Sequence, residues 1–519
     1  TLLAALADAT VEDLAGLDAV ALAARSGLAG TLAPSRMNGF QNILGTFQKL
    51  ANGEQVAGDA SLKQEQAQEQ KKEPVQQNGG QQDGAQPSAV WHPFLEQWGP
   101  APPQEVAVLL SGGVDSSVAL RLLQSQGFSP RAYYLRIWLE DELSHLGDCP
   151  WEEDWDFCQK ICEADPARGL PAVPLESVSL QQAYWDRVVG YTVAEAKAGR
   201  TPNPDIMCNS RVKFGAFIDI LSEMHGGSPP PIASGHYARA VRDDAGCDRV
   251  RLMRGRDDFK DQTYFLSALR QDQIDRLIFP VGGVDKPMVR ALAGDGVLPD
   301  PTLGLGGRGF GLPTATRKDS QGICFLGKIP FDDFLRAHLG ESQGVIRDLA
   351  TGEVVGEHKG LWFHTVGQRR GLGPLLNRGY TNLGPWFVAG KRIAANELII
   401  TNDYEKLLKP RIAFGVSGIS WLEKSLLVPG QSAKLRVQTR HGPIDRARMA
   451  TVTPLSADAT EVLVELDVPD QGLAPGQFAA FYSTDNTECL GAGVISEQGP
   501  NIQAIEDELS AAMGASLEQ

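Results

Sequence analysis

The stretch that decides the fold is VAVLLSGGVDSSVALRLLQSQG, residues 106–127. Its first five residues are an uninterrupted apolar run that ends at a Gly-rich turn, which is typical of a buried parallel strand. Residues 117–126 then place Val118, Leu122 and other apolar side chains at helical spacing, and Gly127 is a C-cap signal. A strand, a turn and a helix in this order predict one unit of an α/β sheet.

The pattern of predicted strands and helices continues downstream. Residues 131–139 predict a second strand, and residues 231–234 predict the end of another. Repetition of this kind indicates a doubly wound parallel sheet. Past Lys328 short strands mix with Gly-rich turns, and residues 411–494 alternate apolar and polar side chains between Pro-Gly turns. We therefore expect an α/β domain, a small mixed domain and a C-terminal antiparallel β-barrel.

A chain of 519 residues is too long for one ordinary domain. Composition indicates a helical N-terminal extension and then a Gln- and Gly-rich segment that is too polar to fold by itself. The expected segments are the extension 1–51, a disordered linker 52–89, the α/β domain 90–327, the central domain 328–409, the barrel 410–498 and an acidic tail 499–519.

Bulk composition excludes some classes of protein. Hydrophobic residues make up 42% and charged residues 22%, and no apolar run of about 18 residues predicts a membrane span. Seven scattered cysteines favour a reducing compartment over a disulfide-rich secreted fold. The net charge of −16 argues against indiscriminate nucleic-acid binding, although part of it lies in the tail and a local basic face is compatible with it.

The turn at Ser111–Ser117 carries the first chemical signal. Its two glycines allow close backbone approach to a ligand, and the serines and the following helix start offer hydrogen-bond donors, so the turn can cradle phosphates. It lacks the Gly-Lys-Thr or Gly-Lys-Ser of a Walker A loop. An ordinary β–α turn is the alternative interpretation, which the aspartate and two serines make less favourable.

Two cysteine-containing stretches carry the next signals. In GRTPNPDIMCN, residues 199–209, Asp205 and Cys208 lie three residues apart, a spacing that can bring a carboxylate and a thiol near one substrate atom. A thiol at a helix start also tends toward the thiolate. In KDSQGICF, residues 318–325, Cys324 follows a glycine-containing turn. Taken singly, each cysteine is more often a buried core residue, and only the fold can bring the two together.

The loop resembles the pyrophosphatase loop of enzymes that form an adenylated intermediate and expel pyrophosphate, usually with Mg²⁺. Several further blocks together resemble the tRNA-specific 2-thiouridylase family, over residues 106 to about 496. They are residues 199–209, 233–237, 260–266, 319–325, 364–373 and 475–477. An ordered set of blocks is far more specific than one loop.

The resemblance implies that the α/β domain binds ATP, that the central domain binds tRNA, and that ATP activates the wobble uridine of the anticodon. Cys324 would carry sulfur as a persulfide, and Cys208 would then form a disulfide with it as the sulfur is released. Asp205 would be the acid/base beside the reacting base. The target base would be flipped out of its stack to reach the site. The implied partners are tRNAs for Lys, Glu and Gln and a cysteine desulfurase or sulfur relay, with no membrane.

The resemblance also implies two sets of binding residues. For ATP they are Leu109, Leu110, Ser111, Gly112, Gly113, Val114, Asp115, Ser116, Ser117, Leu135 and Gly235. For tRNA they are Asn203, Pro204, Asp205, His236, Lys260, Asp261, Gln262, Arg440, His441 and Gln477. His236 as a core histidine, and Lys260 and Arg440 as solvated charges, are the alternative interpretations.

Two remaining features have no implied role. The Gly-rich segment 296–311 is interpreted as a flexible loop rather than a second nucleotide site. Cys149, Cys158 and Cys162 lack the spacing of a zinc site, so packing is expected and no resident metal is predicted. An iron–sulfur cluster on Cys208, Cys324 and a third thiol stays open.

Two other functions stay open at this point. One is an adenylating amidotransferase or synthetase with the same loop, and the other is an RNA-binding protein without activity. The first needs neither Cys208 nor Cys324. For the compartment, the acidic extension ahead of the α/β domain favours a plastid or mitochondrion, with the cytoplasm open. The sequence begins with Thr1 and shows no readable targeting signal.

Overall fold

The computed structural model describes residues 105–137, 151–242, 249–301, 303–319, 329–372, 383–403, 412–422, 427–470 and 473–496, with the single residues 405, 507 and 511. The expected N-terminal extension and linker, and nearly all of the acidic tail, lie outside this part of the chain. Within it, no helix is long and apolar enough to cross a membrane.

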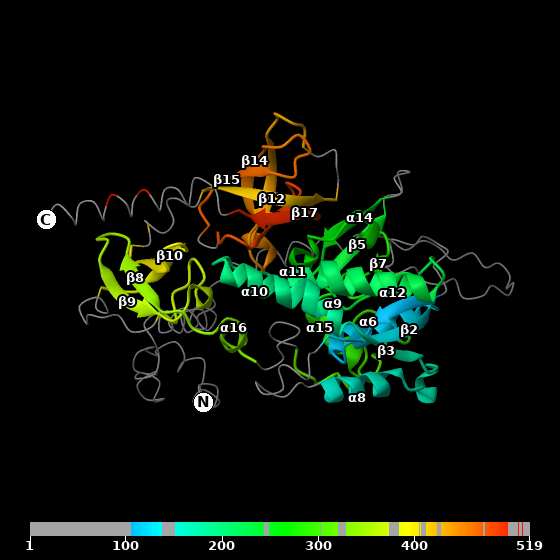
Figure 1. Ribbon diagram of the computed structural model, residues 1–519. Helices are drawn as coiled ribbons and strands as arrows, with labels where there is room; N and C mark the ends of the chain where they lie inside the picture. The colour runs from blue at the N-terminus through cyan, green and yellow to red at the C-terminus, as the bar shows by residue number, and fades with distance from the viewer. Residues whose placement is uncertain are drawn as a thin grey trace, which may run out of the picture. The chain divides into compact units, whose positions relative to one another are not determined.

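The first domain is built on a five-stranded sheet in the order β3-β2-β1-β4-β7. Figure 1 labels β2, β3 and β7 of this sheet. All neighbouring strands run parallel. The strands are β1 (Glu105–Leu109), β2 (Ser129–Arg136), β3 (Leu175–Ser179), β4 (Ile232–Ala233) and β7 (Leu277–Ile278). This topology confirms the predicted doubly wound sheet.

Strand β1 shows why both faces of this sheet are covered. Val106 and Val108 point into one hydrophobic cluster, whereas Ala107 and Leu109 point into another, because successive side chains of a strand alternate between faces. The first face is covered by α6 (Val114–Ser125), α8 (Trp151–Cys162) and α15 (Lys286–Ala293). The second is covered by α9 (Gln181–Tyr184), η4 (Trp185–Val189), α10 (Gly190–Lys197), α11 (Pro204–Met207), η5 (Cys208–Ala216) and α12 (Phe217–Met224).

The middle of the chain forms a small mixed sheet in the order β10-β11-β8-β9. Its elements are α16 (Phe331–Leu339), β8 (Gly344–Asp348), β9 (Val354–His358), η6 (Leu361–Phe363), β10 (Phe387–Arg392) and β11 (Glu397–Thr401). Strands β8 and β11 are parallel and the other pairs antiparallel. Ile346, Val355, Val388 and Leu398 form a core of its own, which agrees with a separate mixed domain.

The C-terminal part is a closed antiparallel barrel, as predicted. Its strands are β12 (Ala413–Trp421), β13 (Ala433–Gln438), β14 (Arg448–Pro454), β15 (Val462–Leu466), β16 (Phe478–Tyr482) and β17 (Glu488–Ile495), with the short η7 (Ile444–Arg446) between β13 and β14. Pairing of β12 with β17 closes the ring. Closure leaves the six strands without a free edge for aggregation, except where another strand adds on.

Another strand does add on, and it comes from the first domain. The hairpin of β5 (Ala238–Arg242) and β6 (Val250–Arg254) pairs through β6 with β17, so the barrel sheet has eight strands. The sequence pattern assigns this hairpin to the α/β domain and gives no sign of the pairing. Strand pairing between segments more than 200 residues apart depends on the tertiary fold.

A buried arginine fastens this junction. Arg254, 3% exposed, donates to Asp261 Oδ2 at 2.8 Å, to Gln438 Oε1 at 3.0 Å and to Asn486 Oδ1 at 2.9 Å. Its guanidinium carbon lies 3.6 Å from the centroid of the Tyr482 ring. A buried charge is tolerated where its hydrogen bonds are made in this way.

The Gly-rich segment 296–311 is packed, which corrects the prediction of a flexible loop. Leu298, Leu303 and Phe310 are buried in the cluster under α15. Backbone hydrogen bonds join Leu298 N to Gly307 O and Phe310 N to Leu292 O. The glycines satisfy a tight backbone path, and the apolar side chains between them anchor the segment. The remaining short helices are η3 (Pro166–Arg168), α13 (Thr263–Leu266) and α14 (Gln271–Ile274).

Candidate nucleotide and thiol sites

The loop Ser111–Ser117 lies at the point where the strand order of the sheet reverses. It follows β1, and the segment beginning at Ser234 follows β4, the strand beside β1 on the other side of the reversal. An added Cβ on Gly235 would come within 2.6 Å of Ser116 N, so the two segments are in close contact. Ligands of open α/β sheets bind in the crevice at such a switch point.

Internal hydrogen bonds set the shape of the loop. Ser116 Oγ lies 3.1 Å from Ser111 Oγ and 3.1 Å from Gly113 O, and Ser117 Oγ donates to Gly113 O at 2.6 Å. Gly112 has a φ of +70°, and a Cβ there would lie 2.6 Å from Asp154 O. Only glycine fits this position without strain and collision.

The helix after the loop starts without a side-chain cap. Gly113 is the N-cap of α6 and provides no side-chain hydrogen bond. The first N–H groups of a helix otherwise lack partners, and the helix dipole is positive at that end. The geometry of the loop therefore suits a phosphate group.

Lysine and arginine side chains converge on the carboxylates around the loop. Lys286 Nζ lies 2.7 Å from Asp115 Oδ1 and 2.9 Å from Asp319 Oδ1. Tyr237 Oη donates to the same Asp115 oxygen at 2.7 Å. Lys260 Nζ lies 3.0 Å from Asp319 Oδ2, and Arg290 also pairs with Asp319. The loop's own aspartate is thus linked to Asp319, the last described residue before the Cys324 stretch.

The effect of these cations is visible in the ionisation of Asp319. Partial burial raises its pKa, but hydrogen bonds from Lys286 and Lys260 outweigh burial and lower the pKa to about 2. Asp319 is therefore ionised at any physiological pH, and the network is held by full charges.

Arg317 completes the surroundings of the loop. Its Nη1 donates to Gly112 O at 2.6 Å, and its Nη2 lies 2.5 Å from Asp154 Oδ1 on α8. The sequence prediction did not include Arg317, Lys286 or Tyr237 among the site residues. Asp285-Lys286-Pro287 is a readable helix start, but only the fold shows that the lysine reaches Asp115.

The candidate adenine-side residue Leu135 lies near the carboxyl end of β2. It is partly buried, pairs with Val178 of β3 and packs on the cluster of the second sheet face. The neighbouring β1 ends in Leu109, and Leu110 follows it; both are buried and directly precede the loop. These residues lie on the same edge of the sheet as the loop.

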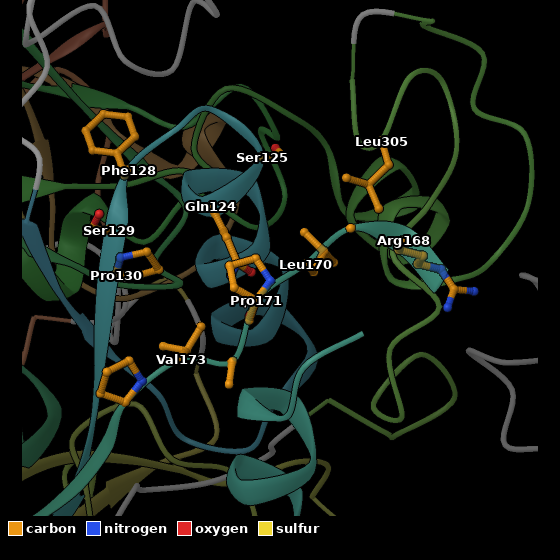
Figure 2. Close-up of a pocket in the computed structure, with 13 residues that line it drawn as sticks. Gln124, Ser125, Phe128, Ser129, Pro130, Arg168, Leu170, Pro171, Val173 and Leu305 are labelled. Atoms are coloured by element: carbon orange, nitrogen blue, oxygen red, sulfur yellow. Dashed lines mark hydrogen bonds between the residues drawn. The ribbon is translucent and has the colours of Figure 1, made fainter. Parts of the chain in front are cut away.

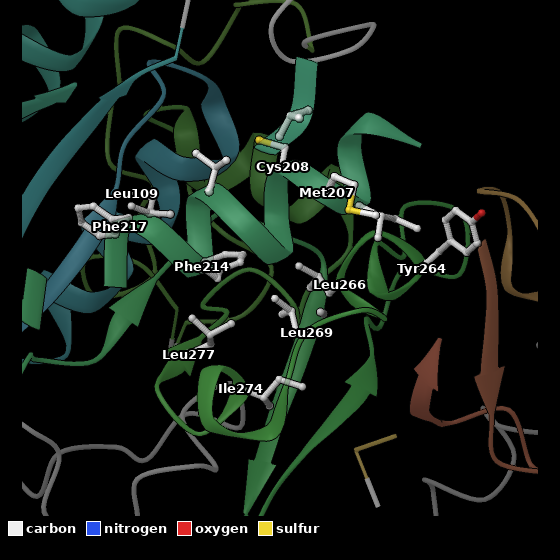
Figure 3. Packing of buried hydrophobic residues seen from close by; sticks show 14 of the residues in the cluster. Leu109, Met207, Cys208, Phe214, Phe217, Tyr264, Leu266, Leu269, Ile274 and Leu277 are labelled. Atoms are coloured by element: carbon white, nitrogen blue, oxygen red, sulfur yellow. The ribbon is translucent and has the colours of Figure 1, made fainter. Parts of the chain in front are cut away.

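Cys208 lies in the hydrophobic core beside the sheet (Figure 3). Its side chain is 1% exposed, and the same cluster contains Leu109, Met207 and Phe214. Helix α11 starts at Pro204 with Asn203 as its N-cap, so Cys208 is the fifth residue after the cap. The thiol is therefore beyond the first turn, where the helix dipole is strongest, and the expected helix-start position is wrong by one turn.

Asp205 and Cys208 nevertheless share one side of the continuous helix α11–η5, because residues three apart are neighbours on a helix surface. Asp205 is only partly buried. The helix continues from Cys208 as a nine-residue π-helical stretch. Such wide turns are rare and recur at functional sites.

The predicted tRNA-contacting residues divide into exposed and buried ones. Lys260 and His441 are exposed, and His441 stacks on Phe265 with ring centroids 4.5 Å apart. Arg440 is partly exposed, with Nη2 3.4 Å from Asp470 Oδ1. Pro204 is buried, and Asn203 is 9% exposed and caps α11.

Three more of these predicted residues make contacts within the protein. Asp261 is 1% exposed and paired with Arg254, and Gln262 Oε1 accepts from Tyr237 N at 3.0 Å. His236 is partly buried, with Nδ1 2.8 Å from Ser234 Oγ, and burial lowers its pKa to about 3. A neutral imidazole is expected at this position at physiological pH.

Gln477 contacts residues 202 and 203, which lead into α11 and η5, the helix that carries Cys208 and is called the thiol helix below. Its Nε2 donates to Pro202 O at 3.1 Å, and its Oε1 accepts from Asn203 Nδ2 at 3.3 Å. The barrel residue therefore touches the residue that caps α11. The family resemblance implied that Gln477 contacts tRNA and gave no sign of its contact with Asn203.

Four other cysteines were considered in the sequence analysis. Of these, Cys324 and Cys149 lie outside the described residues. Cys158 and Cys162 are buried in the core under α6, and burial raises the pKa of these thiols to about 12 and about 11. Both side chains pack, as the sequence interpretation expected. In the described part of the chain no three His, Cys, Asp or Glu side chains could together hold a metal ion.

A groove elsewhere on the α/β domain is not the nucleotide site (Figure 2). It is lined by Gln124 and Ser125 at the end of α6, by Pro130 at the start of β2, and by Arg168 and Leu305. It therefore opens beside the amino end of β2, whereas the loop lies at the carboxyl ends of the strands. Ligands of this fold class bind at the carboxyl ends.

A parallel sheet with a Gly-rich loop and an uncapped helix start at its switch point defines the class: an α/β domain with a phosphate-binding site for a nucleotide. Family models agree over three consecutive ranges. They are a tRNA methyl transferase HUP domain at residues 104–328, a tRNA methyl transferase PRC-barrel domain at 332–402 and an aminomethyltransferase beta-barrel domain at 412–495.

Relatives among well-described proteins match most of this chain. The tRNA-specific 2-thiouridylase MnmA of Parabacteroides distasonis is 38% identical over 396 residues, which is 76% of this chain and 99% of that protein. The enzyme of the same name from Porphyromonas gingivalis is 38% identical over 398 residues, with the same coverage, and that of Vibrio cholerae is 36% identical over 395. The chain belongs to the tRNA-specific 2-thiouridylase family.

Proposed function

We propose that this chain is a sulfurtransferase that uses ATP to replace the 2-oxygen of the wobble uridine in tRNA by sulfur. The observation that carries the proposal is the pairing of the loop Ser111–Ser117 at the sheet's switch point with Cys208 on a helix of the same domain. The loop supplies a place for activation by ATP, and the thiol supplies a group for sulfur chemistry. The relatives' shared name supports the same reaction.

The first step is activation of the uridine. The 2-oxygen forms a bond to the α-phosphorus of ATP as the bond to pyrophosphate breaks. The free N–H groups at the start of α6, the serine hydroxyls of the loop and Lys286 would stabilise the charge on the leaving phosphates. Asp115 fixes Lys286 through two short contacts, at 2.7 and 2.9 Å.

Mg²⁺ would accompany the phosphates. Magnesium usually takes one or two carboxylates and completes its shell with phosphate oxygens and water. Asp115 is the loop carboxylate that would help to hold the ion. The loop therefore suits a metal ion that is bound together with the phosphates of ATP.

The second step transfers sulfur. The terminal sulfur of a persulfide on Cys324 would bond to C2 of the uridine as the bond to AMP breaks. Cys208, as thiolate, would then attack the Cys324 sulfur, which leaves the thiocarbonyl on the base and forms a Cys208–Cys324 disulfide. A thiol reductant must return both cysteines to the reduced state. Asp205 would take up the proton that this sequence releases near the base.

The thiol of Cys208 is 1% exposed, so we expect η5 to shift when substrate is bound. The π-helical turns of η5 offer a route, because a wide turn can tighten into an α-helical one and rotate the residues at its end.

The sulfur donor and the acceptor tRNAs are part of the same proposal. A cysteine desulfurase or a relay protein would load sulfur on Cys324, and tRNAs for Lys, Glu and Gln would be the acceptors. The predicted RNA contacts of Asn203, Lys260, Gln262 and His441 stay predictions. We also propose a plastid or mitochondrion as the compartment, which imaging of a full-length fluorescent fusion tests.

The reaction is tested with the purified chain, ATP, cysteine, a cysteine desulfurase and an unmodified tRNA transcript. The expected result is 2-thiouridine in the digested tRNA by mass spectrometry, with AMP and pyrophosphate formed in step, and its loss in C324S. Thiolation that survives in C324S would overturn the persulfide mechanism. Ammonia incorporation that is independent of both cysteines would instead identify an amidotransferase, and RNA binding without AMP formation a non-catalytic protein.

A further inference from the structure

The segment that leads into the thiol helix, residues 199–203, is held by both of the other domains. On one side the barrel contacts it, since Thr201 N donates to Pro475 O at 2.7 Å and Gln477 donates to Pro202 O. On the other side the middle domain contacts it at Gly199. The segment ends in Asn203, whose side chain caps α11 and so sets where Asp205 and Cys208 lie.

The contact with the middle domain is close. Lys391, near the end of β10, donates from Nζ to Gly199 O at 2.9 Å. Gly199 has a φ of +76°, and a Cβ there would lie 2.0 Å from Ile393 Cδ1. The backbone at Gly199 is therefore covered by one middle-domain side chain and hydrogen-bonded by another.

The setting of Lys391 is unusual for a lysine. Its side chain is half-buried, and its ammonium forms no ion pair with any carboxylate in the described part of the chain. Burial lowers its pKa to about 8. The buried imidazoles of His358 and His364 lie nearby and offer no compensating negative charge. Partly burying an ammonium that has no carboxylate partner among the described residues costs free energy, so packing alone does not explain a lysine here.

We propose that Lys391 is a positioning residue of the thiolation reaction, through which the middle domain holds Gly199 and thereby the helix that carries Asp205 and Cys208. The inference deepens the proposed function and rests on it. In this role Lys391 acts through its hydrogen bond to Gly199 O. It keeps residues 199–203 pressed against Pro475 and Gln477, so that docking of tRNA across the domains acts on a loop of fixed shape.

The test compares K391M with K391R and with K359M in the full-length chain. Methionine keeps the length of the side chain and removes the donor, whereas arginine keeps a donor and the charge. Lys359 lies in the same domain with a side chain that is 69% exposed, so it is the matched control. Three quantities are measured: the single-turnover thiolation rate at saturating ATP and tRNA, the Kd of tRNA, and the rate of Cys208 alkylation by iodoacetamide, followed on its peptide by mass spectrometry.

We expect K391M to lower the single-turnover rate at least tenfold while the Kd of tRNA stays within twofold. Alkylation of Cys208 should become at least fivefold faster, because the released segment opens the core around the thiol. K391R should recover most of the rate, and K359M should match the wild type in all three measurements. A lysine that only stabilises the fold would not change Cys208 reactivity without also changing tRNA affinity.

I393A gives a second approach in case K391M does not fold. It uncovers Gly199 without removing a charge, and we expect the same changes at smaller size. A thiolation rate within twofold of wild type in both variants, or unchanged Cys208 alkylation, would overturn the positioning role. If the wild-type chain produces no 2-thiouridine, the proposed function fails, and the alkylation comparison still decides whether Lys391 holds the thiol helix.

Discussion

At the scale of single residues, the charge network around Asp115 distinguishes this loop from an ordinary β–α turn. Lys286 is only 12% exposed in its side chain and contacts both Asp115 and Asp319. A cation held this close to a phosphate-binding loop is ready to neutralise a leaving pyrophosphate without reorganising. The network also ties the loop to the residue five positions before Cys324.

The first prediction concerns this lysine. K286M removes the charge and keeps the chain length, and we expect kcat/KM for ATP to fall by about 10² because a preorganised cation is lost. The measurement is pyrophosphate release at several ATP concentrations in the presence of tRNA. K160M is the control, since Lys160 lies on α8 of the same domain with a side chain that is 52% exposed. Equal kinetics in the two variants would remove Lys286 from the site.

The second prediction concerns the buried thiols. C208S should lose multiple-turnover thiolation, because no thiolate remains to release the sulfur from Cys324. C489A should keep it, since Cys489 packs at 0% exposure inside the barrel sheet and its thiol stays protonated, with a pKa raised to about 12 by burial. Accumulation of 2-thiouridine is counted per enzyme molecule. Loss of turnover in both variants would mean that packing, not chemistry, explains the effect at Cys208.

At the scale of elements, the hairpin β5–β6 joins two domains that are far apart in the sequence. The hairpin leaves the α/β domain after β4 and pairs with the last barrel strand, and Arg254 fixes it there with Asp261. The predicted tRNA block Lys260–Gln262 follows directly, so the burial of Asp261 gives this block a rigid base. Lys260 is the exposed member of the block and the better candidate for an RNA contact.

The third prediction tests this junction. D261N leaves the guanidinium of Arg254 buried without its counter-charge, which should cost about 3–5 kcal/mol of unfolding free energy. D467N removes the partner of Lys434 in a pair whose side chains are about half exposed, and it should cost about 1 kcal/mol or less. Urea unfolding of both variants gives the comparison. Similar midpoints for the two would show that Arg254 and Asp261 do not fasten the domains.

At the scale of the whole molecule, the segment 199–203 of the first domain is contacted by both of the other domains. Its glycine fits against Ile393, its backbone bonds to Pro475, and its asparagine is held by Gln477. We therefore expect activity to depend on the integrity of the middle domain. The arrangement also makes the stability of that domain relevant to the pH range of the enzyme.

The fourth prediction follows from the histidines of the middle domain. Burial lowers the pKa of His364 to about 4 and also lowers that of His358, and the rings lie 5.9 Å apart. The unfolded chain therefore binds a proton on His364 below about pH 6.5 while the folded chain does not until about pH 4. Stability should fall as the pH drops through this window, by up to about 1.4 kcal/mol per pH unit for His364.

Urea midpoints between pH 7 and pH 4.5, followed by tryptophan fluorescence, measure this effect. His364→Leu should flatten the slope, because a leucine does not titrate. The buried Trp386 lies in the same domain core and reports its unfolding. An identical acid slope in the variant would assign the loss of stability to other groups.

The sequence by itself determined the local chemistry and the class of each domain. The apolar run before Ser111, the glycines of the loop and the alternation in the barrel predicted the parallel sheet, the phosphate loop and the antiparallel barrel. These signals are local, because a strand period, a turn residue and a helix start each depend on a few neighbouring residues. The family blocks predicted roles for Asp205, Cys208 and Cys324 for the same reason.

Only the tertiary structure decided which distant residues meet. Nothing near Lys286 or Lys391 in the sequence distinguishes them from solvated charges, yet one contacts Asp115 and the other contacts Gly199. Cys208 was expected at a helix start and lies one turn further, inside the core. The hairpin that completes the barrel comes from another domain. Contacts of this kind depend on how whole elements pack, since charge pairing, burial and close backbone approach are set by neighbours that the chain brings together only on folding.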